Sequence, residues 1–274
     1  MMRRSQLFVP GNDQKKLEKA AKLEADSIII DLEDAVPEHE KVLARTVASE
    51  ALKQLDWNGK EVCVRINPLT NKAGYLDVFE LGSLERLDTV VVPKAESAGI
   101  IENLYKTTGK TCILLIETAK GFLELEELVR ADGVAAVAYG PADFALSVGG
   151  EVDEYSTNIY VKTKLVITSK AYGLDALDKV FFKLEDHEGF RRESLEAKKL
   201  GYTGKQLIHP TQIPIANAVF SPTQEEIKQA KLIVQSYEQA AKQGVGAVRV
   251  DNNLVDAVHY RLAKKLLDSV DKRQ

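Results

Sequence analysis

Short apolar runs alternate with longer amphipathic segments along most of the chain, and this alternation limits the possible folds more than any other sequence feature. The run at residues 27–31 contains three consecutive isoleucines, which is typical of a strand buried on both faces in a parallel sheet. Strands are predicted at residues 6–9, 27–31, 61–66, 89–92, 112–116, 135–138, 174–177 and 206–208, and helices at 13–23, 38–55, 75–84, 97–106, 121–130, 158–172, 188–200 and 223–242. Eight strand–helix units close a barrel, and 274 residues suffice because such barrels take about 250. We therefore predict an α/β protein, a (β/α)8 TIM barrel.

An open doubly wound sheet is the alternative architecture. Such a sheet usually carries a glycine-rich GxGxxG loop after an early strand, and the sequence contains none. We assign the barrel and its candidate site to residues 1–243. Residues 244–274 are assigned to a C-terminal segment with an amphipathic helix at 255–270, and segments of this kind often form lids or oligomer contacts. A surface helix that packs on its own barrel is the other possibility.

Composition excludes several classes of function. The net charge of −4 argues against a nucleic-acid partner, and no apolar run reaches the roughly 20 residues that span a membrane. Cys63 and Cys112 lie in apolar runs without a CxxC motif, so we expect buried free thiols in a reducing compartment and a cytoplasmic location. The four histidines show no ligand spacing, which makes a zinc site improbable.

Two acidic residues follow consecutive predicted strands. Glu117 comes directly after residues 112–116, and Asp143 lies a few residues beyond 135–138. Ligands of parallel α/β proteins bind at the carboxyl ends of the strands, and carboxylate oxygens suit a hard cation. The alternative is that each acid caps the helix that follows it. Because the two acids occur as a pair, we predict a divalent metal site.

The loops after the second and third strands also concentrate charge. Asp31, Glu33 and Asp34 crowd one loop, where three acids are costly unless a cation, a donor or solvent neutralises them. Arg65 ends the third predicted strand and should face the barrel mouth. Its planar fork suits bidentate recognition of a carboxylate or thioester oxygen. A structural ion pair with one of the acids is the alternative.

Motifs distributed over residues 4–267 resemble one family. They are LFVPGNDQKKLEKA, IIIDLEDAVPEHEK, VRINP, VVPKAES, LLIETAKG, YGPADF, AYGLDALD, LGYTGKQLIHPTQ and FSPTQEEI, in this order. The chain is similar in them to the citrate lyase β-subunit-like group of the HpcH/HpaI aldolase superfamily, together with malyl-CoA and citramalyl-CoA lyases. The segments LEDAVP and GKQLIHPTQ are the most specific.

The resemblance implies a trimer-forming barrel that binds Mg²⁺ and cleaves or forms a carbon–carbon bond beside a CoA thioester. By position, Glu117 and Asp143 match the family's metal ligands, and Arg65 matches its substrate arginine. Glu117 would also contact the substrate. Glu33 and Asp34 are expected to contact the residues that bind the metal and substrate, without binding either directly.

The resemblance also indicates where CoA and the catalytic acid would lie. Phe8, Lys15 and Lys19 match positions that hold the CoA end, although a solvated helix face also explains the lysines. Leu254, Val255 and Asp256 match a C-terminal motif whose aspartate reaches into a neighbouring subunit. The expected catalytic residues are therefore Asp256 and Arg65, in a homotrimer or a multiple of it, with an acyl-CoA as substrate.

The expected activity is Mg²⁺-dependent cleavage of a carboxylated 3-hydroxyacyl-CoA of the citryl-CoA or malyl-CoA type, giving acetyl-CoA and a 2-oxo acid. One alternative is a class II aldolase that acts on pyruvate without CoA. Another is a thioester hydrolase, or a subunit of a larger citrate lyase complex. The barrel alone does not choose among them.

Overall fold

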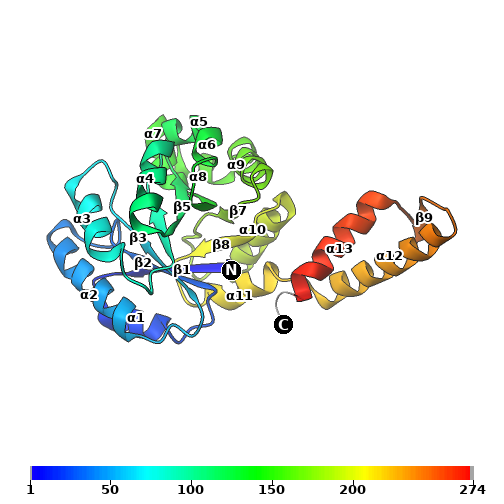
Figure 1. Ribbon diagram of the computed structural model, residues 1–274, viewed down its shortest axis with the longest axis horizontal. Coiled ribbons are helices and arrows are strands. Elements are labelled where there is room, and N and C mark those ends of the chain that lie inside the picture. Colours follow the sequence, from blue (N-terminus) through cyan, green and yellow to red (C-terminus); the bar gives the residue numbers. More distant parts are fainter. Residues whose placement is uncertain (1, 272–274) are drawn as a thin grey trace. The chain divides into compact units, whose positions relative to one another are not determined.

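The computed structural model describes residues 2–271 and separates the chain into two compact units, Met1–Phe220 and Ser221–Gln274. In the first unit eight parallel strands close into a barrel in sequence order, as predicted (Figure 1). The strands are β1 (Ser5–Pro10), β2 (Ser27–Asp31), β3 (Glu61–Arg65), β4 (Thr89–Val92), β5 (Thr111–Ile116), β6 (Val134–Tyr139), β7 (Asp175–Asp178) and β8 (Gly204–Leu207). No helix among the described residues is long and apolar enough to cross a membrane.

Helices connect the strands of this unit. They are α1 (Gln14–Ala20), η1 (Glu38–Glu40), α2 (Lys41–Gln54), α3 (Lys72–Leu81), α4 (Ala98–Thr108), α5 (Ala119–Leu123), α6 (Leu125–Leu128), α7 (Pro141–Val148), α8 (Val152–Thr157), α9 (Ile159–Ala171), α10 (His187–Leu200) and α11 (Gln212–Val219). Helices α7, α8 and α11 were not predicted from the sequence. These helices have only eight, six and eight residues, so they repeat the apolar spacing at most twice.

Alternate residues of each strand face opposite sides of the barrel wall. Ile29 and Cys63 belong to a small cluster inside the barrel, whereas Ile28, Ile30 and Val62 belong to the larger core outside it. Both faces are buried, which explains why the strands read as continuous apolar runs.

A buried ionic network lies where β7 and β8 meet α9 and α10. Lys205 and Asp178 are fully buried and form a short ion pair. Lys205 also contacts Glu193 at 2.6 Å, Lys179 contacts Glu193 at 2.7 Å, and Lys162 lies 3.5 Å from Asp178. Burial by itself would raise the pKa of Asp178, but Lys205 and the other two lysines hold that pKa below its ordinary value.

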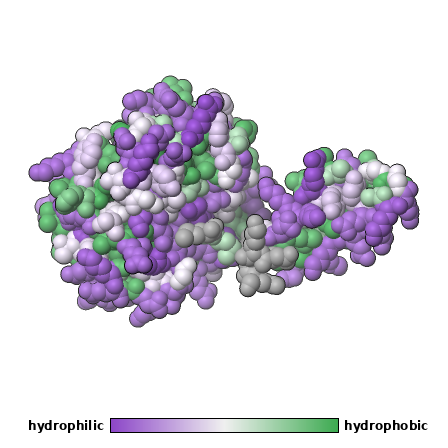
Figure 2. All heavy atoms as spheres, viewed as in Figure 1, coloured by the Kyte–Doolittle hydropathy of each residue, from purple (hydrophilic) through white to green (hydrophobic). Residues whose placement is uncertain are grey.

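The second unit consists of α12 (Gln224–Lys242), β9 (Val248–Val250), β10 (Asn253–Val255) and α13 (Ala257–Asp271). The two strands form an antiparallel hairpin whose turn residues, Asp251 and Asn252, have positive φ. The hairpin joins two helices that pack together (Figure 1). Figure 2 shows the hydrophilic and hydrophobic side chains that each unit presents on one face.

The boundary between units differs from the predicted one at residues 243 and 244. Helix α12, predicted as the eighth barrel helix, belongs to the second unit because it packs along α13. The helix that follows β8 in the barrel is α11, which contacts β1 and β8. The role of the second unit as a lid and oligomer contact stays a prediction.

Candidate active site

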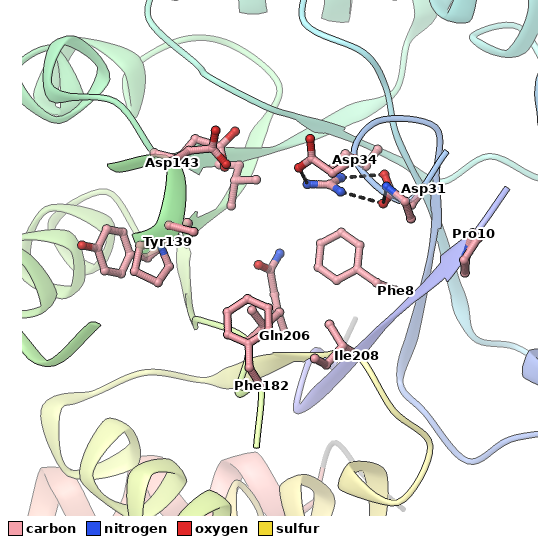
Figure 3. A pocket seen from close by; sticks show the side chains of 17 residues that line it. Phe8, Pro10, Asp31, Asp34, Tyr139, Asp143, Phe182, Gln206 and Ile208 are labelled. Atoms are coloured by element: carbon pink, nitrogen blue, oxygen red, sulfur yellow. Dashed lines mark hydrogen bonds and ion pairs between the residues drawn. The ribbon is translucent and has the colours of Figure 1, made fainter. Parts of the chain in front are cut away.

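A cavity of about 400 Å³ lies at the carboxyl ends of the barrel strands. Its walls combine apolar rings with charged groups from β2, β3 and the segments after β5 and β6, as Figure 3 shows. The lining includes Phe8, Asp31, Asp34, Arg65, Glu117, Tyr139, Asp143, Phe182, Gln206 and Ile208. The pocket therefore brings together most of the residues that the sequence placed at the barrel mouth.

Arg65 is tied to the acidic loop after β2. Its Nε and Nη2 donate to the two carboxylate oxygens of Asp31 at 2.7 and 2.6 Å. Its Nη1 lies 3.0 Å from Glu33 and 3.1 Å from Asp34. Burial by itself would lower the pKa of Arg65, but Asp31 and its neighbours hold that pKa above its ordinary value. The bidentate face of the guanidinium thus binds Asp31. This is the structural ion pair that the sequence offered as the alternative to direct substrate recognition.

Arg65 nevertheless remains part of the pocket. The guanidinium carbon lies 4.9 Å from the centre of the Phe8 ring, so the ring packs beneath the charge. Both side chains line the cavity. Asp31 orients the guanidinium there, whereas the sequence left open which of the loop acids would pair with Arg65.

Lys94, which the sequence analysis did not select, stands among the acids of the site. Its ammonium donates to Glu33 at 2.8 Å and lies 3.8 Å from Glu117 and 3.5 Å from Asp143. Its backbone N–H donates to Glu117 at 2.9 Å, with a φ of 48° that is uncommon outside glycine. Lys94 follows β4, so its place at a strand end was the only available signal.

Glu117 is the most deeply buried of the three acids around Lys94, with 2% of its surface exposed. Burial raises its pKa to about 8, and the nearby Glu33 carboxylate contributes in the same direction. Burial likewise raises the pKa of Glu33. Such buried acids favour either a proton or a cation beside them.

The capping alternative fails for Glu117. Thr118 is the N-cap of α5, and its side chain accepts from Gly121. Asp143 does lie in the first turn of α7, where an acid also suits the helix dipole. Gly140 precedes that turn, and a Cβ at this position would collide with the Glu117 side chain. The close approach of the two loops therefore requires glycine.

The two carboxylates fit a magnesium site with few protein ligands. Glu117 and Asp143 both lie within 4 Å of one ammonium, so their charges already converge on a cation. Among residues 2–271, no group of three or more His, Cys, Asp or Glu side chains is arranged to hold a metal ion. Mg²⁺ commonly uses one or two carboxylates and completes its shell with water and substrate oxygens.

Three further predicted residues are not among those that line the cavity. Lys15 and Lys19 are exposed on α1 and are not among the residues that line the pocket. Asp256 lies at the start of α13 in the second unit, 2.7 Å from Nδ1 of His259. That contact lowers the pKa of Asp256, so the carboxylate form is favoured there. The assigned roles of all three residues remain predictions.

Comparisons with known proteins agree with the family resemblance and with the barrel fold. The family model HpcH/HpaI aldolase/citrate lyase matches residues 4–210. A (3S)-malyl-CoA thioesterase of Cereibacter sphaeroides is 33% identical over 266 residues, which cover 96% of this chain and 93% of the relative. The mitochondrial citramalyl-CoA lyase of Rattus norvegicus is 32% identical, over 97% of this chain and 85% of the relative.

One solved structure resembles nearly the whole chain. It is protein CitE of Mycobacterium tuberculosis in complex with magnesium, acetoacetate and coenzyme A. The TM-score is 0.81 at 28% identity, and the match covers 96% of each chain. The similarity thus extends beyond the barrel strands to most of both proteins.

Proposed function

Because the chain belongs to the HpcH/HpaI aldolase/citrate lyase family, we propose that it is a Mg²⁺-dependent carbon–carbon lyase. Its substrate would be a carboxylated 3-hydroxyacyl-CoA of the citryl-CoA or malyl-CoA type, and its products acetyl-CoA and a 2-oxo acid. The observation that carries this proposal is the convergence of Glu117 and Asp143 on one cation position beside Arg65. The magnesium and CoA in the related CitE structure support it.

Glu117 and Asp143 would hold the metal. When bound, Mg²⁺ supplies positive charge that lowers the pKa of the substrate hydroxyl and orients the substrate oxygens. The two carboxylates fix the position of that charge, and Asp31 fixes the position of the Arg65 guanidinium. Arg65 then stabilises the negative charge that develops on the thioester oxygen.

The bond that breaks joins the carbinol carbon to the carbon next to the thioester. The hydroxyl would give its proton to solvent water and become the carbonyl of the 2-oxo acid, and the electron pair of the broken bond would pass to the acetyl-CoA enolate. Asp256 of another copy of the chain would give the enolate carbon a proton. In the condensation direction the Asp256 carboxylate would act as the base, which is the form favoured beside His259.

The CoA arm would extend from the pocket toward α1. Lys15 and Lys19 are exposed there and would meet its phosphates. A shared Asp256 also requires an oligomer, for which we propose a homotrimer.

Hydrolysis of the thioester is the second candidate, and the similarity to a malyl-CoA thioesterase favours it. The two reactions give different products. We would incubate the purified protein and Mg²⁺ with malyl-CoA, citramalyl-CoA and citryl-CoA, and measure 2-oxo acid, acetyl-CoA and free CoA thiol. A lyase releases 2-oxo acid and acetyl-CoA in equal amounts. Release of free CoA thiol together with the intact hydroxy acid would identify the activity as hydrolysis and not cleavage of the carbon–carbon bond. Turnover of an aldol substrate that carries no CoA would favour the aldolase.

A further inference from the structure

The floor of the pocket contains an amide that the proposed chemistry does not use. Gln206 lies on β8 and has 2% of its surface exposed, yet it lines the cavity. Figure 3 shows its amide pointing into the centre of the pocket, beside the Phe8 ring and below Asp143. Gln206 is therefore buried by the barrel and directed at the space that a small molecule would occupy.

A second amide lies next to it across the seam of the barrel. Gln6 on β1 is the register partner of Gln206 and is fully buried. Gln6 lies two residues before Phe8 on the same strand, so both face the interior, but Gln6 is not among the residues that line the cavity. The two glutamines thus have similar surroundings, and only Gln206 reaches the pocket.

The apolar cluster inside the barrel offers these two amides no side-chain hydrogen-bond partners. This cluster consists of Ile29, Cys63, Val91, Ile113, Leu115, Ala136, Ala138 and Leu177. Among the described residues, Nε2 of Gln206 has no hydrogen-bond partner, nor does either amide atom of Gln6, and all three atoms are enclosed by the barrel. A buried donor without a partner is costly, and buried polar groups in folded proteins usually have a partner in the protein or in ordered water. Of the two amides, only that of Gln206 belongs to a residue that lines a space from which a ligand could supply the partner.

We propose that Gln206 determines specificity for the oxo-acid half of the substrate. This inference rests on the function proposed above. A half-turn of the amide about its last bond brings the enclosed Nε2–H to the cavity, where it donates a hydrogen bond to an oxygen on the side arm of that half. The site therefore prefers an arm that carries an oxygen acceptor, such as carboxylate, over hydrogen or methyl. The small oxo-acid half reaches the floor, because the long CoA arm must leave through the mouth. A methyl arm leaves the donor unpaired, and sites of this type reject such analogues strongly.

The test compares two 2-oxo acids that differ in one carboxylate, fresh oxaloacetate and pyruvate. Their dissociation constants from the full-length protein are measured by calorimetry with Mg²⁺ present. The wild-type protein should bind oxaloacetate more tightly. Gln206→Met keeps the length of the side chain but removes the donor. The ratio of the dissociation constant for pyruvate to that for oxaloacetate should therefore fall by roughly tenfold. Gln206→Glu should lower the ratio further, because it places a carboxylate against the carboxylate of the ligand.

Gln6→Met is the matched control. It makes the same change on the adjacent strand, outside the cavity lining, and should leave the ratio at its wild-type value. An unchanged ratio in a folded Gln206→Met protein would overturn the inference. So would an equal fall in Gln6→Met, because the effect would then come from repacking of the barrel interior.

Glu117→Gln separates this inference from the proposed function. Suppose that Glu117→Gln no longer binds oxaloacetate or pyruvate, while Gln206→Met keeps the wild-type ratio of dissociation constants. The proposed metal site is then supported, and only the specificity role of Gln206 fails. If the wild-type protein binds neither acid, or Glu117→Gln binds both normally, the proposed function fails and the inference fails with it.

Discussion

Arg65 binds both carboxylate oxygens of Asp31, with Nε 2.7 Å from Oδ1 and Nη2 2.6 Å from Oδ2. The pair joins the ends of two neighbouring barrel strands, because Asp31 and Arg65 are register partners on β2 and β3. The same guanidinium lines the pocket over Phe8. Asp31 is therefore a positioning residue for the only arginine that lines the cavity among the described residues.

Arg65→Lys should lower kcat/KM on the order of 100-fold, because an ammonium cannot keep both the Asp31 pair and its place at the thioester oxygen. Asp31→Asn should also lower it, and the double variant should be little worse than Arg65→Lys alone, because the two residues act as a unit. Steady-state kinetics would show this.

Arg45→Lys is the control for Arg65→Lys. Arg45 is a buried arginine that pairs with the buried Asp77 at 3.3 Å, between α2 and α3. We expect this change to lower stability and to leave the kinetics unaltered. If Arg65→Lys behaves in the same way, Arg65 is purely structural.

Glu117→Gln and Asp143→Asn should each abolish activity and weaken Mg²⁺ binding while the barrel stays folded. Each change removes a carboxylate oxygen from the proposed site. Calorimetric titration with Mg²⁺ and circular dichroism measure the two effects. Glu126→Gln makes the same chemical change at an exposed position on α6 and should alter neither. Full activity of either site variant in the presence of a chelator contradicts the metal site.

Lys94→Met should tighten Mg²⁺ binding by about tenfold, because the ammonium that now lies near Glu117 and Asp143 repels a second cation. The same change should lower stability when Mg²⁺ is absent, because Glu33 loses its hydrogen-bonded partner. Calorimetry and melting curves with and without Mg²⁺ measure both effects. Lys120→Met, at an exposed lysine, serves as the control. Weaker Mg²⁺ binding in Lys94→Met would instead make Lys94 a supporting residue of the metal site.

Asp256→Ala and Glu117→Gln should each be inactive alone, and mixtures should recover activity once subunits exchange. Recovery is expected because some mixed interfaces combine an intact Asp256 with an intact metal site. Light scattering should also show a closed oligomer, which we expect to be a trimer. Absence of activity after verified exchange would place Asp256 outside a shared site, and a monomer would exclude sharing.

Asp178→Asn should destabilise the barrel by about 3–5 kcal/mol at neutral pH, because the fully buried Lys205 loses one of its two ion-pair partners and keeps only Glu193. The folded pKa of Asp178 lies below its ordinary 3.8, so its ionised form stabilises the fold above that pH, and the stabilisation is lost as pH falls through the folded pKa. Urea unfolding measured across this pH range should show that the free energy of unfolding falls less steeply toward acid pH in the variant than in the wild-type protein. An exposed control, Asp153→Asn, should keep the wild-type profile.

The sequence by itself determined the barrel and the positions at its mouth. Apolar periodicity is local information, so eight strands and their order could be read along the chain, and Glu117 and Asp143 could be placed after the strands that carry them. The family resemblance was likewise carried by motifs that are continuous in sequence and was confirmed by the match over residues 4–210.

Only the tertiary structure decided which side chains meet. Gln6 and Gln206 become neighbours because β1 pairs with β8 when the barrel closes. Lys94 enters the acidic cluster because its backbone takes a positive φ, and Arg65 pairs with Asp31 because of the register between β2 and β3. The long helix α12 packs on α13, although its own periodicity is equally compatible with packing on a barrel. Such contacts depend on closure, register and packing between distant segments, which local periodicity does not encode.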